Sequence, residues 1–124
     1  MPPTDQEIAT FIRGSFRSVW TLELLLHLRD HGERAWSAAE LVGALRASDA
    51  IVAQGIDSLF AAGLIIVDAE RNASYRPASD DVAALADGAA RLYAQRPDAV
   101  RRLIVGATED GLAAFADAFR LRRD

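Results

Sequence analysis

The sequence contains no cysteine, which excludes disulfide bonds, thiolate metal sites and cysteine nucleophiles. It contains no lysine either: all 14 basic residues are arginines, against 18 acidic residues, and the formal net charge is −4. A chain with this acidic balance does not attract nucleic acid through its overall field. Any contact with DNA therefore has to come from a local cluster of arginines.

Long hydrophobic runs are also absent. The most apolar stretch, residues 19–28, is interrupted by Glu23 and His27 and is shorter than the roughly 20 residues that a bilayer requires. The chain does not open with a basic segment followed by an apolar run and a cleavage site. We therefore expect a cytoplasmic protein without a membrane partner. At 124 residues, of which 51% are hydrophobic, the chain fits a single domain, 1–124, with a packed core.

Serine and threonine residues mark the starts of several helices. Thr4 with Glu7, and Ser37 with Glu40, show the capping-box pattern that satisfies the free backbone N–H groups of a first turn. Ser48 is a further cap. The apolar spacing after these and similar caps predicts helices within residues 4–17, 19–31, 38–46, 49–62, 79–95 and 98–105, and from residue 108 onward.

A short β-hairpin is expected between two of these helices. Gly63 ends the helix 49–62, residues 64–67 alternate as a strand, residues 70–73 form a turn, and residues 74–76 return as a second strand. The order predicts a mainly α fold: a winged helix-turn-helix with a three-helix core, a hairpin wing and additional C-terminal helices. The expected parts are an N-terminal helix in 1–17, the core in 18–77 and C-terminal helices in 78–124.

Two short strings and one cap carry a family resemblance. They are WSAAEL at residues 36–41, Ser48, and LFAAGLI at residues 59–65. With them, residues 19–77 resemble the winged helix-turn-helix superfamily of bacterial regulators, in the style of MarR-, ArsR- and PadR-type proteins. The ending, residues 115–124, resembles that of small bacterial winged-helix proteins of unassigned role. The resemblance implies a transcriptional regulator, and flanking helices (1–17 and 78–124) that build a homodimer.

In such regulators the second helix of the motif enters the DNA major groove, so helix 49–62 and wing 68–74 are the expected DNA-binding elements. Ser48, Ala50 and Gln54 would meet bases, since a glutamine amide can contact adenine and alanine can contact a thymine methyl. The expected contacts outside the major groove come from Arg46, Arg71, Asn72 and Arg76. This hypothesis conflicts with the charge of helix 49–62, which carries two aspartates and no basic residue.

The alternative hypothesis is a winged-helix adaptor that binds another protein and no DNA. Two surfaces are candidates: the acidic outer side of helix 49–62, and the arginine-rich C-terminal part of the chain. The arginines of that part are Arg101, Arg102, Arg120, Arg122 and Arg123. They are also explained as cations that stabilise helix C-termini, so both interpretations of them stay open.

Catalysis and metal binding have little support in the sequence. No phosphate-binding glycine loop and no nucleophile elbow is present, so we expect neither an enzyme nor a cofactor. Glu23, His27 and His31 follow one another at steps of four along a helix, which makes them the candidate metal ligands. The same stripe is explained as the solvated edge of a core helix.

Overall fold

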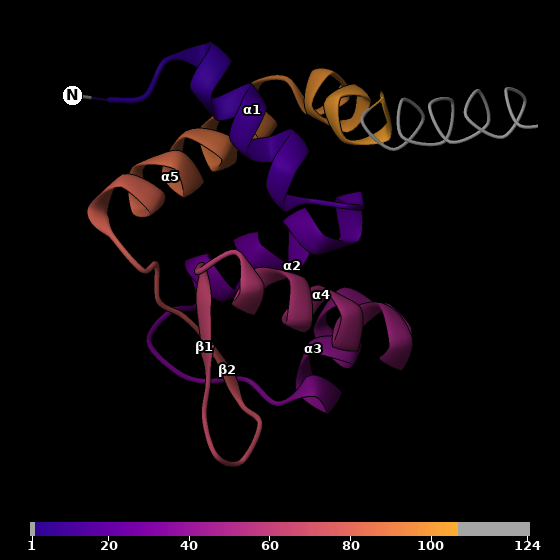
Figure 1. Ribbon diagram of the computed structural model, residues 1–124. Coiled ribbons are helices and arrows are strands. Elements are labelled where there is room, and N and C mark those ends of the chain that lie inside the picture. Colours follow the sequence, from indigo (N-terminus) through magenta and orange to yellow (C-terminus); the bar gives the residue numbers. More distant parts are fainter. Residues whose placement is uncertain (1, 107–124) are drawn as a thin grey trace, which may run out of the picture.

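The computed structural model describes residues 2–106. Its helices are α1 (Asp5–Ser15), α2 (Val19–Asp30), α3 (Ala38–Leu45), α4 (Asp49–Ala61) and α5 (Asp80–Gln95), and its strands are β1 (Ile65–Val67) and β2 (Ala73–Tyr75). A further helical segment covers residues 97–106. This order confirms the expected mainly helical, winged-helix-like arrangement (Figure 1). The helix expected from residue 108 onward, with Arg120, Arg122 and Arg123, lies outside the described residues.

The helices begin where the sequence predicts. Thr4 and Ser37 form complete capping boxes with the glutamates three residues on, and Ser18, Ser48 and Ser79 each accept a backbone N–H in the following turn. These caps satisfy N–H groups that have no partner inside the helix, and each contributes about 1 kcal/mol. The element starts are therefore fixed by local chemistry.

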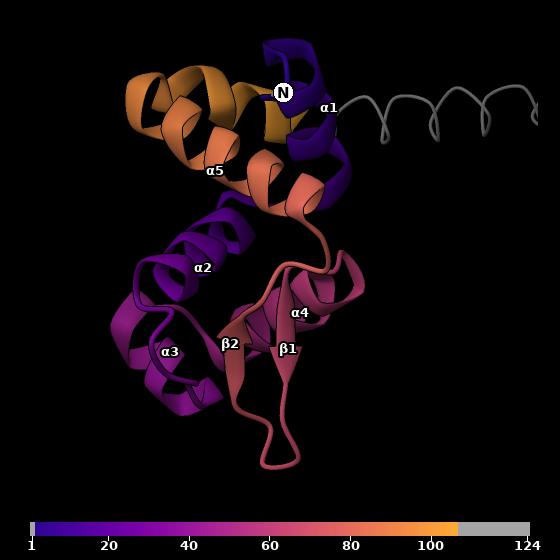
Figure 2. The same cartoon turned by 90° about the vertical axis from the view of Figure 1, so that its left-hand side faces the viewer.

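The elements form two groups (Figure 2). α1, α5 and segment 97–106 lie together at one end, and α2, α3, α4 and the hairpin form the winged-helix core at the other. α2 is central, because its leucines at 22, 24, 25 and 28 are fully buried. The two groups are also joined by polar contacts: the Tyr93 hydroxyl donates to Glu23 at 2.9 Å, and Arg29 donates to Asp87 at 2.9 Å.

Two glycines allow helices to approach closely. A Cβ at Gly55 of α4 would lie 2.7 Å from Cδ2 of Leu24, and a Cβ at Gly88 of α5 would lie 2.6 Å from Cδ1 of Ile8. Both distances are shorter than real Cβ atoms tolerate. The close α2–α4 and α1–α5 contacts therefore require glycine, which has no side chain, at positions 55 and 88.

The hairpin differs by one residue from the expectation on each strand. β1 pairs antiparallel with β2 in the register Ile65↔Tyr75, Ile66↔Ser74 and Val67↔Ala73. β2 begins at Ala73, which pairs with Val67 on one side and exchanges two backbone hydrogen bonds with Trp36 on the other, at 2.7 and 2.8 Å. This bridge attaches the segment before α3 to the hairpin. Gly63, with φ of 75°, makes the left-handed turn between α4 and β1.

Within residues 2–106, no helix is long and apolar enough to cross a membrane.

Candidate interaction face on α4

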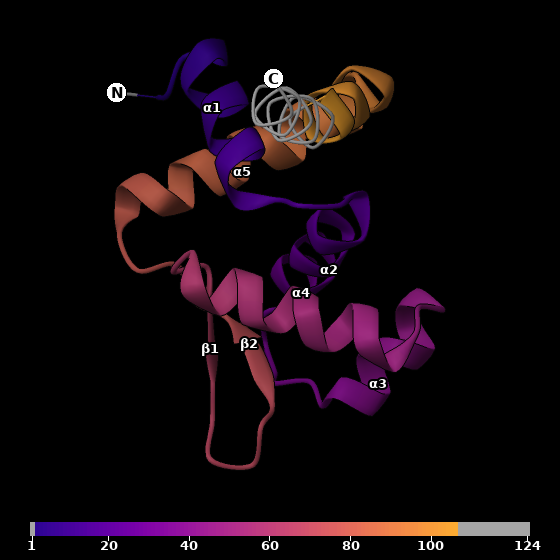
Figure 3. The same cartoon turned by 45° about the vertical axis from the view of Figure 1, so that its right-hand side comes forward.

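α4 runs across the outside of the winged-helix core, and the hairpin extends to one side of it from the region of its C-terminal end (Figure 3). Val52, Gly55 and Leu59 are its buried residues. Six residues on the outer side of α4 are exposed: Ala50, Ala53, Gln54, Asp57, Phe60 and Ala61. We call these six residues, together with the exposed Trp20 of α2, the α4 face. Asp49 and Asp57 are the charged residues of α4, so the helix presents two negative charges and no positive charge.

A hollow borders the α4 face on the side of α2. Trp20 lines it, together with Gln54 and Asp57 of α4 and Arg17 of the preceding loop. Trp20 is 39% exposed, although it belongs to the helix whose leucines at 22, 24, 25 and 28 are fully buried. An indole left in solvent beside a hollow provides a large, rigid apolar contact surface.

A second hollow borders the α4 face on the side of the hairpin. Phe60 and Asp57 line it from α4, and Val67 and Arg71 line it from the hairpin. Phe60 is 51% exposed. Asp57 lines both hollows, so this acidic residue is shared by the hollow beside Trp20 and the hollow beside Phe60.

Sequence reasoning missed both aromatic residues. Phe60 follows Ile56 by four residues, which is the spacing of an apolar side of a helix. The signal that could have identified Phe60 is the 100° turn per residue, which places it beside Ala53 and Asp57 on the outer side.

The tip of the hairpin is ordered by a single carboxylate. Oδ1 of Asp68 accepts the backbone N–H groups of Glu70 and Asn72, both at 2.9 Å. Arg71, between them, takes φ of 66° and donates its own N–H to the carbonyl of Asp68 at 3.0 Å. The turn therefore holds Arg71 in a left-handed conformation that non-glycine residues seldom adopt.

The candidate base-contacting residues all lie at or near the α4 face. Ala50 and Gln54 are exposed on it. Ser48 precedes α4 and is also exposed, but its Oγ accepts the N–H of Ile51 at 3.2 Å. A contact from this hydroxyl to a base would therefore compete with its role as the helix cap.

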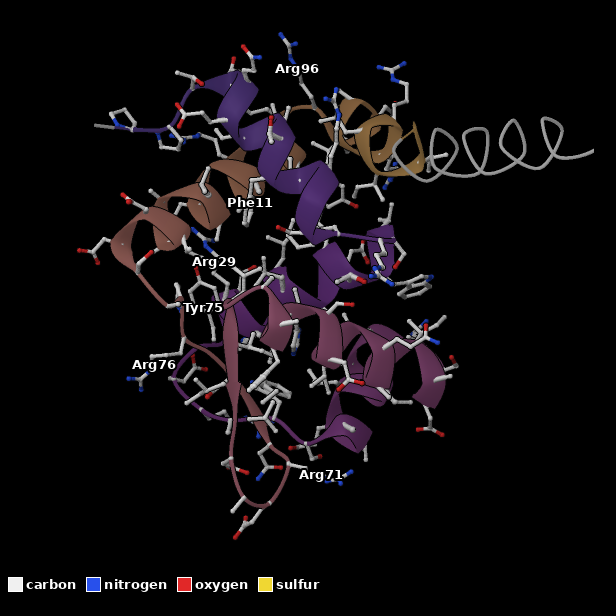
Figure 4. The ribbon with its side chains drawn as sticks, in the orientation of Figure 1. Phe11, Arg29, Arg71, Tyr75, Arg76 and Arg96 are labelled. Carbon is white, nitrogen blue, oxygen red and sulfur yellow. The ribbon has the colours of Figure 1, made fainter. Side chains whose placement is uncertain are left out.

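The arginines expected to contact DNA outside the major groove do not form one cluster. Arg46 ends α3 in a left-handed conformation, with φ of 55°, and is exposed beside the start of α4. Arg71 and Arg76 project to opposite sides of the hairpin (Figure 4). Asn72 is half-buried at the hairpin tip. Only Arg71 of this set lines a hollow at the α4 face.

Arg34, a further cation near α3, is occupied within the chain. Its guanidinium carbon lies 3.5 Å from the centroid of the Trp36 ring, and its Nη2 donates to Glu40 at 2.9 Å. The hydrogen bonds from Arg34 and from the Ser37 backbone lower the pKa of Glu40 to about 2. The Glu40 carboxylate therefore stays charged at neutral pH, and Arg34 adds no free positive charge to this side.

The candidate metal ligands are divided between two environments. Glu23 accepts the hydroxyl of Tyr93, whereas the rings of His27 and His31 lie 4.6 Å apart beside Trp36. Burial, followed by the charge of His31, lowers the pKa of His27. Among residues 2–106 no three metal-ligating side chains lie close enough to hold one ion. The stripe along α2 therefore does not form a three-ligand metal site.

α1 packs within its own chain, because Ile8 lies directly over Gly88 of α5. The N-terminal helix was expected at a dimer interface, and the contact with Gly88 occupies one side of that helix. The homodimer stays a prediction.

The fold and the α4 face define a class of protein: a mainly helical, winged-helix-like domain. Its α4, the second helix of the motif, is acidic and has the exposed Trp20 and Phe60 on its face. The sequence matches no protein-family model, no curated protein and no solved structure.

Proposed function

We propose that this chain is a non-catalytic winged-helix module that binds a segment of another protein on the α4 face. The observation that supports this proposal is the composition of the face. Trp20 and Phe60 are 39% and 51% exposed on either side of Asp57, and α4 carries no basic residue. Exposed aromatic residues that frame a polar centre are typical of the energetically dominant residues of protein interfaces.

The charge of the face selects the partner's chemistry. A bound segment would place apolar side chains against Trp20 and Phe60, and a lysine or arginine next to Asp57. An amphipathic helix with a basic residue between two apolar ones has this pattern, and it is a common ligand of a groove beside a helix. Module and partner would regulate by steric contact, with no chemical step.

The aromatic residues supply most of the expected binding energy. Covering the exposed half of Phe60 removes about 100 Å² of apolar surface from water, which corresponds to about 2 kcal/mol before the cost of association. Covering Trp20 adds a similar amount. The carboxylate of Asp57 mainly fixes orientation and disfavours anionic partners.

DNA binding in a cytoplasmic transcriptional regulator is the second candidate function. The observation that favours it is the exposure of Ala50 and Gln54 on the second motif helix, with Arg71 on the adjacent hairpin. Against it, phosphate neutralisation supplies most of the affinity for DNA, and the two aspartates of α4 would face phosphates.

A charge-reversal variant distinguishes the two functions. Fluorescence anisotropy on a random DNA duplex at low salt compares the native chain with Asp49→Lys/Asp57→Lys, which adds four units of positive charge to α4. We expect no binding by the native chain and salt-sensitive binding by the variant, because the fold then presents cations to the groove. Native binding that weakens steeply with salt would replace the protein-docking proposal with the DNA one.

Site-specific photo-crosslinking in the native host cells tests the protein partner. A photoreactive residue is placed at Ala61, next to Phe60 on the α4 face, or, as a control, at Ile66 of β1, which is also exposed but does not belong to the α4 face. We expect a discrete protein adduct from position 61 that disappears when Phe60→Ser or Asp57→Lys is added. Identical adduct patterns from positions 61 and 66, or an adduct that survives both changes, would contradict the proposal.

A further inference from the structure

A hollow of about 590 Å³ lies among α1, α5 and segment 97–106, at the end of the molecule that does not include α4. We call it the arginine hollow. Three exposed arginines and one exposed acid line it: Arg13, Arg96, Arg102 and Asp5. The remaining lining is apolar or glycine: Leu92, Ala99, Leu103 and Gly106. Each arginine comes from a different part of the chain, namely α1, the cap of α5 and segment 97–106.

The charge of the arginine hollow is opposite to that of the protein. Three arginines and one aspartate give +3 − 1 = +2 in a chain whose net charge is −4. Within residues 2–106 none of the three arginines forms an ion pair, whereas Arg29, Arg34 and Arg101 each pair with a carboxylate. The fold therefore places three arginines in the lining of one partly apolar depression, and no described carboxylate pairs with them.

We infer that the arginine hollow binds a small organic phosphate. A guanidinium group presents parallel N–H donors that match phosphate oxygens, and a phosphate monoester carries close to two negative charges at neutral pH. The half-buried Leu92 and Leu103 would contact the organic part of the ligand. The volume lies within the range of small-molecule sites. This site is separate from the α4 face and does not depend on the function proposed for it.

The mixed lining predicts a graded preference among simple probes. Phenyl phosphate offers both a dianion and an apolar ring, inorganic phosphate offers the charge alone, and phenol offers the ring alone. Calorimetric titration of the full chain should give saturable one-to-one binding of phenyl phosphate. Inorganic phosphate should bind at least about fivefold more weakly, because the ring contact is lost, and phenol should give no saturable heat.

Single substitutions test the role of the arginines. Arg13→Gln, Arg96→Gln and Arg102→Gln should each weaken phenyl phosphate binding by about fivefold or more, because each removes a charge-assisted contact. The matched control is Arg76→Gln, which changes an arginine that is also exposed but lies at the hairpin, far from Arg96 (Figure 4). It should leave the affinity unchanged. Circular dichroism verifies that all four variants stay folded.

Three results would overturn the inference. The first is the absence of saturable phenyl phosphate binding to the native chain. The second is a loss of affinity in Arg76→Gln as large as in the three hollow variants, which would indicate attraction by overall charge. The third is equal affinity for phenyl phosphate and inorganic phosphate, which would remove the role of Leu92 and Leu103.

Discussion

Substitution of Gly88 by alanine tests the packing of α1 on α5. Gly88 is buried in α5, and an alanine Cβ there would lie 2.6 Å from Cδ1 and 2.9 Å from Cγ1 of Ile8. Both atoms belong to one side chain that is itself 4% exposed, so Ile8 has little room to move away. The added methyl group therefore has to displace α1 or force Ile8 from its rotamer.

Two opposing terms set the magnitude. Alanine is favoured over glycine in a helix interior by about 1 kcal/mol. Overpacking a filled core costs about 1–3 kcal/mol. The sum predicts that Gly88→Ala lowers the free energy of unfolding by up to about 2 kcal/mol. Gly43→Ala in α3 is the control, because nothing lies within 4 Å of a Cβ at Gly43, and it should stabilise by about 0.5–1 kcal/mol.

Urea denaturation of the two variants measures these changes directly. A double variant, Gly88→Ala with Ile8→Val, removes the Cδ1 atom that makes the closest contact and should recover part of the lost stability. The reasoning is refuted if Gly88→Ala is as stabilising as Gly43→Ala, or if Ile8→Val destabilises the Gly88→Ala chain as much as it destabilises the native chain.

Three further predictions concern pH and the hairpin. Burial lowers the pKa of His27. The contribution of neutral His27 to stability is therefore complete above the usual histidine pKa of 6.5 and is lost as the pH falls below 6.5. His27→Gln should flatten this part of a pH–stability curve. The hydrogen bond from Arg34 lowers the pKa of Glu40 from 4.5 to about 2. The contribution of the Glu40 carboxylate to stability is therefore present above pH 4.5 and is lost as the pH falls toward 2. Glu40→Gln should remove that pH dependence in the same experiment. Asp68→Ala removes the acceptor of two hairpin N–H groups at 2.9 Å, so hydrogen exchange at Asn72 should accelerate while the free energy of unfolding falls by no more than about 1 kcal/mol.

The sequence predicted the element order because the signals for helix ends are local. Thr4, Ser37 and Ser48 act within four residues of their own positions, and so does the stop at Gly63. An interaction that short is contained in the sequence window that suggests it. The bridge between Trp36 and Ala73 spans 37 residues and was not predicted, because nothing near either residue indicates its partner.

The sequence predicted which helix carries the candidate site, but not which apolar side chains are exposed there. Helical spacing identified Ala50 and Gln54 as outward residues, which depends only on the geometry of α4. The exposure of Trp20 and Phe60 depends on which neighbours happen to cover them. A helix with apolar residues on several sides does not show in its sequence which of them the fold leaves uncovered.

The winged-helix order does not by itself select between DNA and protein as the ligand of α4. The core is stabilised by buried residues such as Leu24 and Leu59, and exposed side chains away from it change stability by little. The outer side of α4 can therefore carry positive or negative residues without loss of the fold. Only the side chains on that outer side distinguish a DNA ligand from a protein ligand. A phosphate backbone requires cations where this helix has Asp49 and Asp57. A protein partner requires a desolvated apolar contact, which the half-exposed ring of Phe60 offers, and a complementary charge, which a basic residue next to Asp57 supplies.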